Sequence, residues 1–183
     1  MHRRTFIQSA LALAAAPFAA HALTRLADGD TAPMPNETAG AAQQPAPKLD
    51  KPKAEWRKLL TGPQYAVLFE ESTERPGTSP LNAEKRAGTF VCAACHAPLF
   101  ASAAKFESGT GWPSFYQPLP GRVATKRDFK MILPRTEYHC ARCGGHQGHV
   151  FNDGPPPTGQ RYCNNGVALR FVPEGEASPA LRT

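Results

Sequence analysis

The stretches Cys92-Ala93-Ala94-Cys95 and Cys140-Ala141-Arg142-Cys143 contain four of the five cysteines in the 183-residue sequence. Two cysteines separated by two residues direct both sulfurs toward one point, and two such pairs form a tetrahedral cage that suits Zn²⁺. The 44 residues between the pairs predict that the cage joins two hairpins distant in the sequence. Four thiolates leave no open coordination position, so we expect one structural metal ion. The alternatives are iron in the same cage, two redox-active pairs, or two disulfides.

Short runs of strand-forming residues, separated by glycine and proline, surround these pairs. This pattern is typical of a small antiparallel β domain with long loops, and long loops in a compact domain indicate function or restraint by metal. The predicted strands cover residues 89–91, 123–125, 130–133, 136–139, 148–151, 160–163 and 168–172. The predicted fold class is therefore mainly β.

Two short helices are predicted before the strands. Apolar residues within 53–60 have the spacing of an amphipathic helix. The segment Thr61-Gly62-Pro63-Gln64 has the pattern of a capping box with an early proline, which predicts a second helix ending near Glu70. The expected core contacts of these helices are Trp56, Leu60, Tyr65 and Leu68.

The first 22 residues have the features of an export signal. Arg3 and Arg4, followed by a modestly apolar, alanine-rich run, resemble a twin-arginine signal, and Ala20-His21-Ala22 fits a cleavage site. We therefore expect residues 1–22 to be a twin-arginine-type signal peptide and the protein to be periplasmic. The alternative is a mitochondrial presequence or a disordered start.

The rest of the chain divides into three parts. Residues 23–50 are rich in proline and alanine and predict a flexible linker, 51–175 predict one domain, and 176–183 predict a disordered tail. No run of 18 or more apolar residues is present, so no stable membrane association is expected. The formal net charge of +6 becomes 6 − 2 = +4 without Arg3 and Arg4, a mild excess typical of a solvated surface.

The fifth cysteine, Cys163, has no partner in the two pairs and is a candidate nucleophile. A thiol attacks as its thiolate, and an unperturbed thiol has a pKa of about 8.5. Residues two apart on a strand share a face, so Arg161, Cys163 and Asn165 are expected on one surface, with the guanidinium favouring the thiolate. The alternative is an inert buried cysteine, since free cysteines are often buried.

Two further segments suggest a reactive site. His146 and His149 lie in a glycine-rich stretch after the second cysteine pair, and histidines exchange protons near neutral pH. Trp112 lies on a glycine-flanked loop, where it is either a core residue or the wall of a small apolar pocket.

Together these motifs resemble the B-type methionine sulfoxide reductases, which act on the R epimer of the sulfoxide. The resemblance runs from about Ala54 to Val172, nearly the whole predicted domain. It is carried by Glu55-Trp56 with Leu59, Thr73-Glu74-Arg75-Pro76, both cysteine pairs, Lys105-Phe106 through Phe115, His146 to Asp153, and Arg161-Tyr162-Cys163-Asn164-Asn165.

The resemblance implies a catalytic role for five residues. Cys163 is implied as the thiolate that attacks the sulfoxide sulfur and becomes a sulfenic acid. His146 and His149 are implied to hold and protonate the sulfoxide oxygen, and Asn165 and Arg161 to orient this network.

The resemblance also implies the surroundings of these residues. Trp112, with Phe151, is implied to pack on the methyl group of the substrate and set the stereochemistry. The implied fold is a pair of antiparallel sheets with short N-terminal helices, stapled by a zinc ion that lies away from the active site.

The sequence departs from the family at two positions. Many members carry a resolving cysteine where this chain has Thr110, so we expect a one-thiol cycle in which an external thiol reduces the sulfenic acid. Many members also have an aromatic residue in place of Gly77, which puts one contact at the pocket edge in doubt. The expected partners are oxidised proteins or peptides, as substrates in protein repair, and a thioredoxin-like or small-thiol reductant. We expect a monomer and no nucleic-acid partner.

Two other functional classes fit parts of the sequence. A zinc-ribbon module that binds nucleic acid would use the same cage and the positive charge, but lysine and arginine are scattered without a dense stripe. A secreted structural domain would pair its cysteines in disulfides and hold no zinc. Weak, steeply salt-dependent DNA binding without reductase activity would favour the first class. Metal content together with a free-thiol count tests the second.

Overall fold

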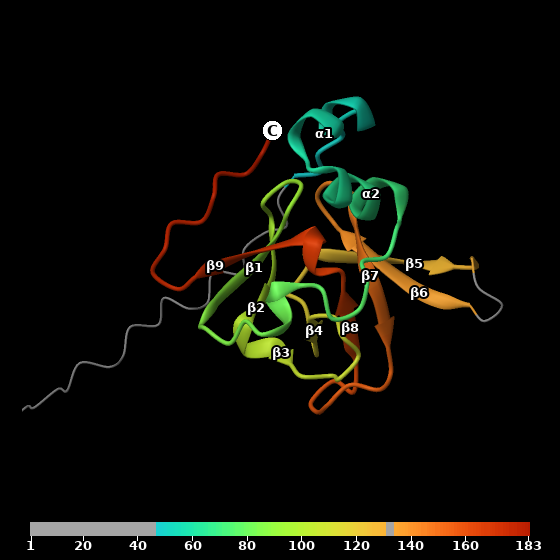
Figure 1. Ribbon diagram of the computed structural model, residues 1–183, viewed down its shortest axis with the longest axis vertical. Coiled ribbons are helices and arrows are strands. Elements are labelled where there is room, and N and C mark those ends of the chain that lie inside the picture. Colours follow the sequence, from blue (N-terminus) through green and yellow to red (C-terminus); the bar gives the residue numbers. More distant parts are fainter. Residues whose placement is uncertain (1–46, 131–133) are drawn as a thin grey trace, which may run out of the picture. The chain divides into compact units, whose positions relative to one another are not determined.

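The computed structural model describes residues 47–130 and 134–183. In that part of the chain the elements follow one another as α1 (Lys53–Leu59), α2 (Gly62–Glu70), η1 (Pro80–Asn82), β1 (Gly88–Cys92), β2 (Pro98–Ala101), η2 (Ser102–Ala104), β3 (Lys105–Phe106), β4 (Ser114–Phe115), β5 (Val123–Asp128), β6 (Arg135–Cys140), β7 (His146–Phe151), β8 (Arg161–Asn164), η3 (Gly166–Ala168) and β9 (Leu169–Pro173). They form a three-stranded sheet, β2-β1-β9, and a six-stranded sheet, β3-β4-β8-β7-β6-β5. All strand pairs are antiparallel. The structure confirms the mainly β fold with two antiparallel sheets and short N-terminal helices (Figure 1).

The two helices form where the sequence predicts them. Thr61 caps α2 with a capping box, in which its hydroxyl accepts from the Gln64 amide and the Gln64 side chain accepts from the Thr61 amide. The ring of Trp56 stacks on that of Phe69, with centroids 5.3 Å apart. The expected core contacts are confirmed, since Trp56, Tyr65 and Leu68 are buried and Leu60 packs against the core.

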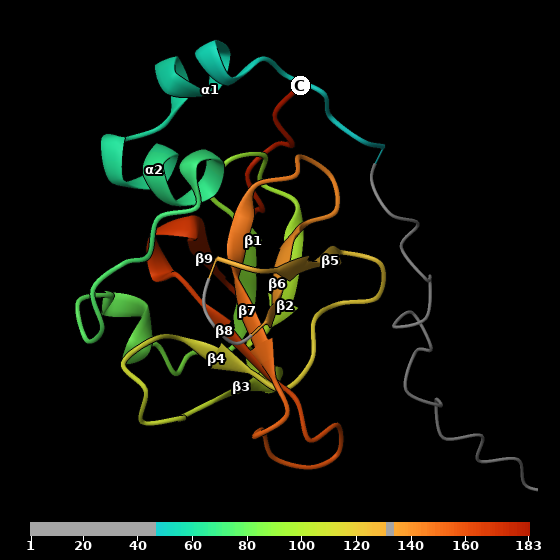
Figure 2. The same ribbon diagram turned by 90° about the vertical axis from the view of Figure 1, so that its right-hand side faces the viewer.

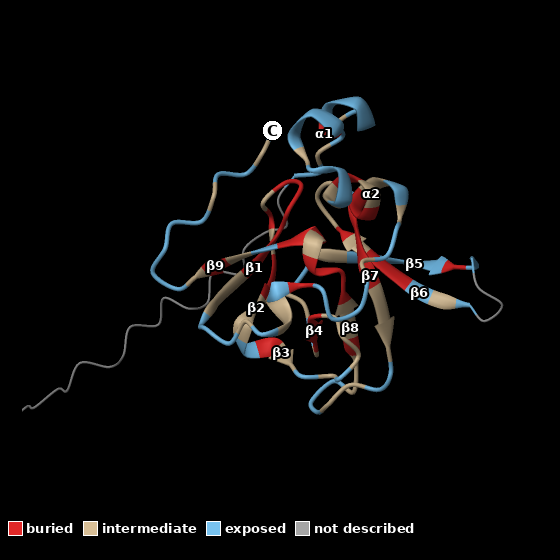
Figure 3. Cartoon of the chain, in the orientation of Figure 1, coloured by how far each residue is buried: buried red, intermediate tan, exposed pale blue. Residues whose placement is uncertain are grey.

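Aromatic side chains from both sheets fill the space between them. Phe100 stacks on Phe115 with a centroid distance of 4.2 Å, and Phe90 meets Phe115 edge-on at 5.0 Å. Tyr138 and Tyr162 extend this cluster. Such ring pairs each add about 0.5–1.5 kcal/mol beyond the area they bury. The cluster fixes β4 and β8 against the core, where Figure 3 shows buried residues concentrated.

Six of the seven predicted strands coincide with observed strands, and three observed strands were not predicted. Those three are β2, which begins at a proline, and β3 and β4, which have two residues each. Strands this short do not show the alternation of apolar and polar residues from which a strand is predicted. The seventh predicted strand, 130–133, is not a strand where it can be described: Lys130 forms a bend, and 131–133 lie outside the described residues.

Both ends of the predicted domain differ from the prediction. Residues 1–46, which include the predicted signal peptide and most of the linker, lie outside the described residues. Leu49, predicted as linker, instead packs on the core, and its amide donates to the Arg142 carbonyl at 2.7 Å. In the described part of the chain, no helix is long and apolar enough to cross a membrane.

The C-terminal segment makes contacts that the predicted disorder of residues 176–183 did not include. After β9 it turns back toward the end of the domain where α1 lies (Figures 1 and 2). The Arg182 guanidinium donates to the carbonyls of Ala93 and Ala94, and its amide donates to the Cys95 carbonyl. His96 Nδ1 also hydrogen-bonds to the Ala180 carbonyl. These bonds satisfy carbonyl groups of the first cysteine turn, which explains the order of the segment.

Candidate active site and metal centre

The four paired cysteines form a compact cluster at one end of the domain. Their sulfurs all lie within 4.8 Å of one another, with 3.7 Å between Cys92 and Cys143 and 3.6 Å between Cys95 and Cys140. Sulfurs at tetrahedral corners about 2.3 Å from a Zn²⁺ are about 3.8 Å apart. All five cysteines of the chain are free, which contradicts the disulfide alternative. The cluster therefore fits a tetrahedral metal ion held by four thiolates.

The two turns that hold the sulfurs have the same backbone design. The residue after each second cysteine, His96 or Gly144, has a left-handed φ of 63° or 71°, and its amide donates back to the carbonyl of the first cysteine, at 2.9 Å in both turns. Glycine enters this region without cost, and another residue enters it with some strain. This repetition explains why two segments far apart in sequence present sulfurs in matching geometry.

Positive charge and a buried amide surround the cluster. Arg142 lies between two of the cysteines, and its Nε and Nη1 are buried without a hydrogen-bond partner among the described residues. Arg182 binds the first turn, as described above. The buried Gln147 donates from Nε2 to the Cys92 sulfur at 3.6 Å. Four thiolates around a divalent ion carry a net charge of −2, so these groups suit a metal-loaded cluster.

Cys163 lies on β8, between β4 and β7. It stands opposite Ser114 on one side and opposite His149 on the other. Directly opposed residues in an antiparallel pair face the same side, with β-carbons about 4.5–5.5 Å apart. A β-carbon on Gly148 would overlap the Cys163 carbonyl oxygen, so glycine is required there for β7 to approach. The structure thus places the lone thiol beside one of the two predicted histidines.

The groups around Cys163 have opposite effects on the pKa of its thiol. Burial raises the pKa of the thiol, while the charge of Arg161 and hydrogen bonds from Thr110 and Arg161 lower it, and burial prevails. Asp153 binds Arg161 through two hydrogen bonds of 2.9 and 2.8 Å, and its negative charge raises the pKa of the thiol. The guanidinium favours the thiolate as predicted, but it does not hold Cys163 ionised at neutral pH in the free protein.

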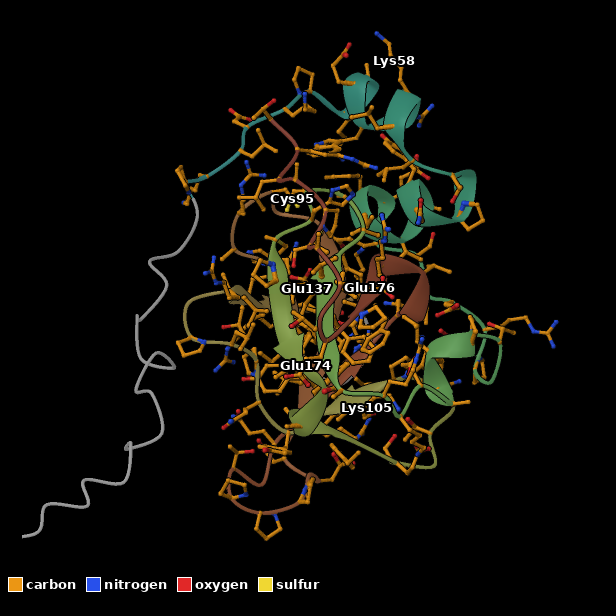
Figure 4. All side chains as sticks on the ribbon, turned by 90° about the vertical axis from the view of Figure 1, so that its left-hand side faces the viewer. Lys58, Cys95, Lys105, Glu137, Glu174 and Glu176 are labelled. Carbon is orange, nitrogen blue, oxygen red and sulfur yellow. The ribbon has the colours of Figure 1, made fainter. Side chains whose placement is uncertain are left out.

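Each histidine is held by a carboxylate from a neighbouring strand. His146 Nδ1 donates to Glu137 at 2.7 Å, and His149 Nε2 donates to Asp128 at 2.8 Å. The two rings meet edge-on, with centroids 5.5 Å apart. Figure 4 labels Glu137, which lies within the sheets, and Cys95, which lies nearer the helices. The carboxylates fix one nitrogen of each ring, and the other nitrogen has no hydrogen-bond partner among the described residues.

The pKa values of these groups follow from burial and partners. Burial lowers the pKa of His149, and its bond to Asp128 only partly restores it. The pKa of Asp128 is held low by the Lys130 amide and by His149. Burial raises the pKa of Glu137, but the interactions with His139 and His146 lower it by more, so the net shift of the pKa is downward. The free site therefore contains ionised carboxylates and a neutral His149 at neutral pH.

A pocket of about 150 Å³ opens over Cys163. Its lining comprises Thr73, Trp112, Arg135, Gly148, His149, Phe151, Cys163, Asn164 and Asn165. Phe151 stacks on Arg161, with the guanidinium carbon 4.4 Å from the ring centroid. The pocket therefore joins an apolar wall, from Trp112 and Phe151, to a polar side that holds the thiol and an imidazole.

Glu74 connects the segments that form this pocket. Its carbonyl accepts from Trp112 Nε1 at 2.9 Å, and its carboxylate accepts from the Gly166 amide at 2.6 Å. Its amide donates to Asn165 Oδ1 at 2.9 Å, while Asn165 Nδ2 donates to the Gln147 carbonyl at 2.9 Å. Asn165 is thus a structural bridge at the pocket floor, and Trp112 is fixed in the wall.

The structure brings most of the predicted site residues together. Of the predicted catalytic and substrate residues, Cys163, His149, Asn165, Trp112 and Phe151 line the pocket, and Arg161 supports it. His146 lines a neighbouring basin of about 380 Å³ that shares Thr73, Arg135 and His149 with the pocket. Sequence reasoning gave no role to Asp128, Glu137, Asp153 and Glu74. Each of these carboxylates meets its partner through contacts between strands or loops, and not through a fixed spacing along one element, so no local pattern indicates them.

Comparison with known proteins agrees with this geometry. The SelR domain family matches residues 60–173. The peptide methionine sulfoxide reductase MsrB of Agrobacterium fabrum is 52% identical over 129 residues, which cover 70% of this chain and 96% of that protein. The MsrB of Pseudomonas putida is 52% identical over 131 residues, covering 71% and 98%. The MsrB of Methanosarcina barkeri is 51% identical over 129 residues, covering 70% and 91%.

Proposed function

This chain belongs to the SelR domain family of B-type methionine sulfoxide reductases, and we propose that Cys163 is the nucleophile of its reaction. The protein is an oxidoreductase that reduces the R epimer of methionine sulfoxide in peptides. The observation that carries the assignment is the position of Cys163, opposite His149 and in one pocket with Trp112 and Phe151.

The pocket geometry supports a specific binding mode. Trp112 and Phe151 offer an apolar surface to the methyl group of the sulfoxide, and the sulfoxide oxygen points to the histidine side. Reversing the configuration at sulfur would exchange the methyl group and the oxygen, placing a polar oxygen on the aromatic wall. This arrangement accounts for selectivity between the epimers.

The reduction proceeds by transfer of oxygen from one sulfur to another. The Cys163 thiolate attacks the sulfoxide sulfur while His149, assisted by His146, donates a proton to the oxygen. The attack forms an S–S bond between Cys163 and the substrate. The hydroxyl then passes from the substrate sulfur to the Cys163 sulfur as the S–O and S–S bonds of the substrate sulfur break, so that methionine leaves and Cys163 becomes a sulfenic acid. The two electrons that reduce the substrate come from Cys163. Proton donation of this kind contributes roughly 10²–10⁴-fold to the rate.

An external thiol restores Cys163. A first thiol displaces the hydroxyl as water and forms a mixed disulfide, and a second thiol releases reduced Cys163 and a disulfide of the reductant. The other four cysteines cluster at the metal centre, and position 110, where many relatives carry a resolving cysteine, is a threonine. Both facts support a one-thiol cycle. Oxidised protein treated with dimedone should carry one adduct, at Cys163, and an intramolecular disulfide to Cys163 would contradict the cycle. Thr110→Cys supplies a control that can form such a disulfide.

The metal centre is proposed to hold one Zn²⁺ on Cys92, Cys95, Cys140 and Cys143. When bound, this ion supplies structural cross-linking between the two cysteine turns, because four thiolates leave it no open position. Iron fits the same donor set, so elemental analysis of the purified protein identifies the ion. One zinc per chain and one reactive thiol is the expected result.

Protein-bound sulfoxide is proposed as the preferred substrate. The basin beside the pocket provides space for residues that flank the oxidised methionine. A peptide substrate should therefore show a lower KM than free methionine sulfoxide. Equal KM values would contradict this preference.

Export to the periplasm is proposed from the twin arginines at positions 3 and 4. Replacing both with lysine should retain the protein in the cytoplasm, as judged by cell fractionation. Unchanged export would contradict the twin-arginine route. We also propose that the protein is a monomer, which sedimentation measurements test.

The central experiment is an assay that separates the two epimers. With dithiothreitol as reductant, the full chain should reduce the R sulfoxide of a methionine peptide and leave the S sulfoxide. Cys163→Ser should lose at least about 10³-fold in rate, since the variant lacks the attacking thiolate. Full activity of Cys163→Ser would reject the assignment, and its unchanged thermal unfolding controls for misfolding.

A further inference from the structure

The carboxylate of Glu74 binds the free amides at the start of the short helix η3. Its Oε2 accepts from the Gly166 amide at 2.6 Å and from the Val167 amide at 3.4 Å. Asn165, which precedes η3, makes no side-chain capping bond among the described residues. The acceptor that these amides need therefore comes from a segment 92 residues away in the sequence. The contact is close, since a β-carbon on Gly166 would lie 3.2 Å from Glu74 Oε2.

Glu74 is the half-buried member of an otherwise exposed run. Residues 72–78 are all exposed except Glu74. Another part of the run is held by its main chain, through the Gly77 amide, which donates to the Gly111 carbonyl at 2.7 Å. The Glu74 side chain is therefore the part of this run that ties it to η3.

The main chain of the same residue holds the Trp112 ring. Trp112 Nε1–H, the only polar group of an indole ring, donates to the Glu74 carbonyl at 2.9 Å. The backbone next to Trp112 is fixed separately, since the Asn164 amide donates to the Pro113 carbonyl at 2.9 Å. The bond to Glu74 therefore fixes the far end of the ring, and with it the angle at which the ring faces the pocket.

The bonds of Glu74 join two walls of the pocket over Cys163. Trp112 lines the pocket and precedes β4, whereas Gly166 begins η3 three residues after Cys163. The Glu74 amide adds a further bond on the η3 side, to Asn165 Oδ1 at 2.9 Å. Glu74 thus links the ring on one wall to the segment that carries the thiol, and so sets the space between them.

We propose that Glu74 is a positioning residue, whose carboxylate, held by the amides of η3, sets the angle of the Trp112 ring and so determines the affinity for the methyl group of the sulfoxide. The proposal rests on the proposed function, in which Trp112 packs on that methyl group. A ring that turns away leaves the methyl group uncovered, and one methylene in an apolar pocket is worth about 10–200-fold in discrimination. The reach of the acceptor, rather than its charge, decides this role, because the two groups that it binds are uncharged amides.

Substitutions at position 74 separate reach from charge. Glu74→Gln keeps the length of the side chain and an oxygen that accepts from the Gly166 amide. Glu74→Asp keeps the charge but is shorter by one carbon–carbon bond, about 1.5 Å. Glu74→Ala removes the acceptor. Glu176→Ala, at an exposed position after β9, is the control for loss of a surface carboxylate.

The first measurement is the steady-state rate of the metal-loaded full chain on a peptide that contains the R sulfoxide, with dithiothreitol as reductant. Glu74→Ala and Glu74→Asp should raise KM about tenfold and change kcat less than about threefold, because binding of the methyl group is weakened while the thiol and the imidazole remain. Glu74→Gln and Glu176→Ala should keep KM within about threefold of the unmodified value. If Glu74→Ala does not fold, as judged by thermal unfolding, Glu74→Asp alone still tests the role.

The second measurement follows the Trp112 ring without substrate. Hydrogen exchange of its Nε1–H is recorded by NMR, with Trp112→Phe to assign the resonance, since the chain has two tryptophans. Exchange should be about tenfold faster in Glu74→Ala and Glu74→Asp than in the unmodified protein, because the carbonyl that holds the ring is no longer anchored. Glu74→Gln should exchange at the unmodified rate.

The outcomes distinguish this inference from the proposed function. Unchanged exchange and unchanged KM in Glu74→Asp would overturn the role of Glu74, as would a Glu74→Gln variant that behaves like Glu74→Ala. Faster exchange without a rise in KM would overturn the link from the ring to substrate affinity. Absence of sulfoxide reduction in the unmodified protein would instead reject the proposed function and, with it, the effect on affinity, while faster exchange in Glu74→Asp would still show that Glu74 holds the ring.

Discussion

Cysteine serves two opposite purposes at two places in this molecule. At the metal centre, three of the four cysteines are buried, and the sulfurs gather where strands β1 and β6 end and the two turns begin. At the active site, Cys163 lies on a strand, is half-buried, and faces a pocket with an imidazole. The same side chain is a ligand where neighbouring sulfurs can saturate a cation, and a nucleophile where only proton donors and an apolar wall surround it. The neighbouring side chains, and not the thiol itself, therefore decide whether a cysteine binds metal or reacts.

The two places are also joined. Gln147 donates to the Cys92 sulfur, and its side-chain carbonyl accepts from Asn164 next to Cys163, at 3.4 Å. Substitutions at each place show whether the metal centre is only structural and the active site only catalytic, and whether Gln147 couples them.

The largest effect on stability is expected from the loss of a buried cage cysteine. Cys95→Ser removes one of four ligands, and the structural metal in such sites contributes much of the folding free energy. We expect loss of the metal and a free energy of unfolding lower by several kcal/mol, measured by elemental analysis and by urea denaturation. Cys163→Ser is the matched control and should retain both metal and stability. A metal-free Cys95→Ser of unchanged stability would contradict a structural role.

The metal centre and the active site also differ in how far the sequence predicts them. The cage is encoded by two local spacings, and the capping box of α2 by four adjacent residues, so both were predicted. The carboxylates that hold the imidazoles were not, since Asp128 and Glu137 meet the histidines only through the β5-β6-β7 register. The docking of Arg182 was missed for the same reason, because its partners lie 88 and 89 residues away. Residues 1–46 and 131–133 lie outside the described residues, so the predictions made for them stay predictions.

The side chain of Gln147 links the metal centre to the active site. Gln147→Met keeps the volume of a fully buried side chain and removes its bond to Cys92. Loss of such a partner to a metal ligand typically lowers metal affinity about 10–100-fold, which competition with a chromophoric chelator measures. With metal in excess, reductase activity should stay within about threefold, because Asn165 bonds to the Gln147 backbone carbonyl. Gln160→Met, remote from the cage sulfurs, is the control. A tenfold loss of activity in metal-loaded Gln147→Met would show that the two places are coupled.

The third prediction uses the opposite pKa shifts of the acid and the nucleophile. Burial lowers the pKa of His149 and raises that of Cys163, so protonated His149 with ionised Cys163 is a minor form whose fraction is constant between the two values. The rate constant kcat/KM should therefore be flat between them and fall on both sides. Asp128 raises the pKa of His149, so Asp128→Asn should move the acidic limb to lower pH and lower the plateau about tenfold. An acidic limb that moves in Glu137→Gln instead would assign the proton donor to His146.

The smallest effect is expected from the C-terminal segment, which lies beyond residue 173, where the family match ends. Arg182 binds the carbonyls between Cys92 and Cys95, so its charge stands beside a cluster that carries −2 when loaded with a divalent ion. The side chain is partly exposed, and solvent weakens its attraction to the cluster. Arg182→Ala should therefore release metal to a chelator only about threefold faster, in keeping with about 0.7 kcal/mol for partly buried hydrogen bonds of this kind. Arg170→Ala removes the same charge from the exposed face of β9 and should not change the rate. Equal rates of metal release for both variants would mean that the C-terminal segment contacts the metal centre without stabilising the bound ion. The four cysteines and the side chains next to them would then account for metal retention without this segment.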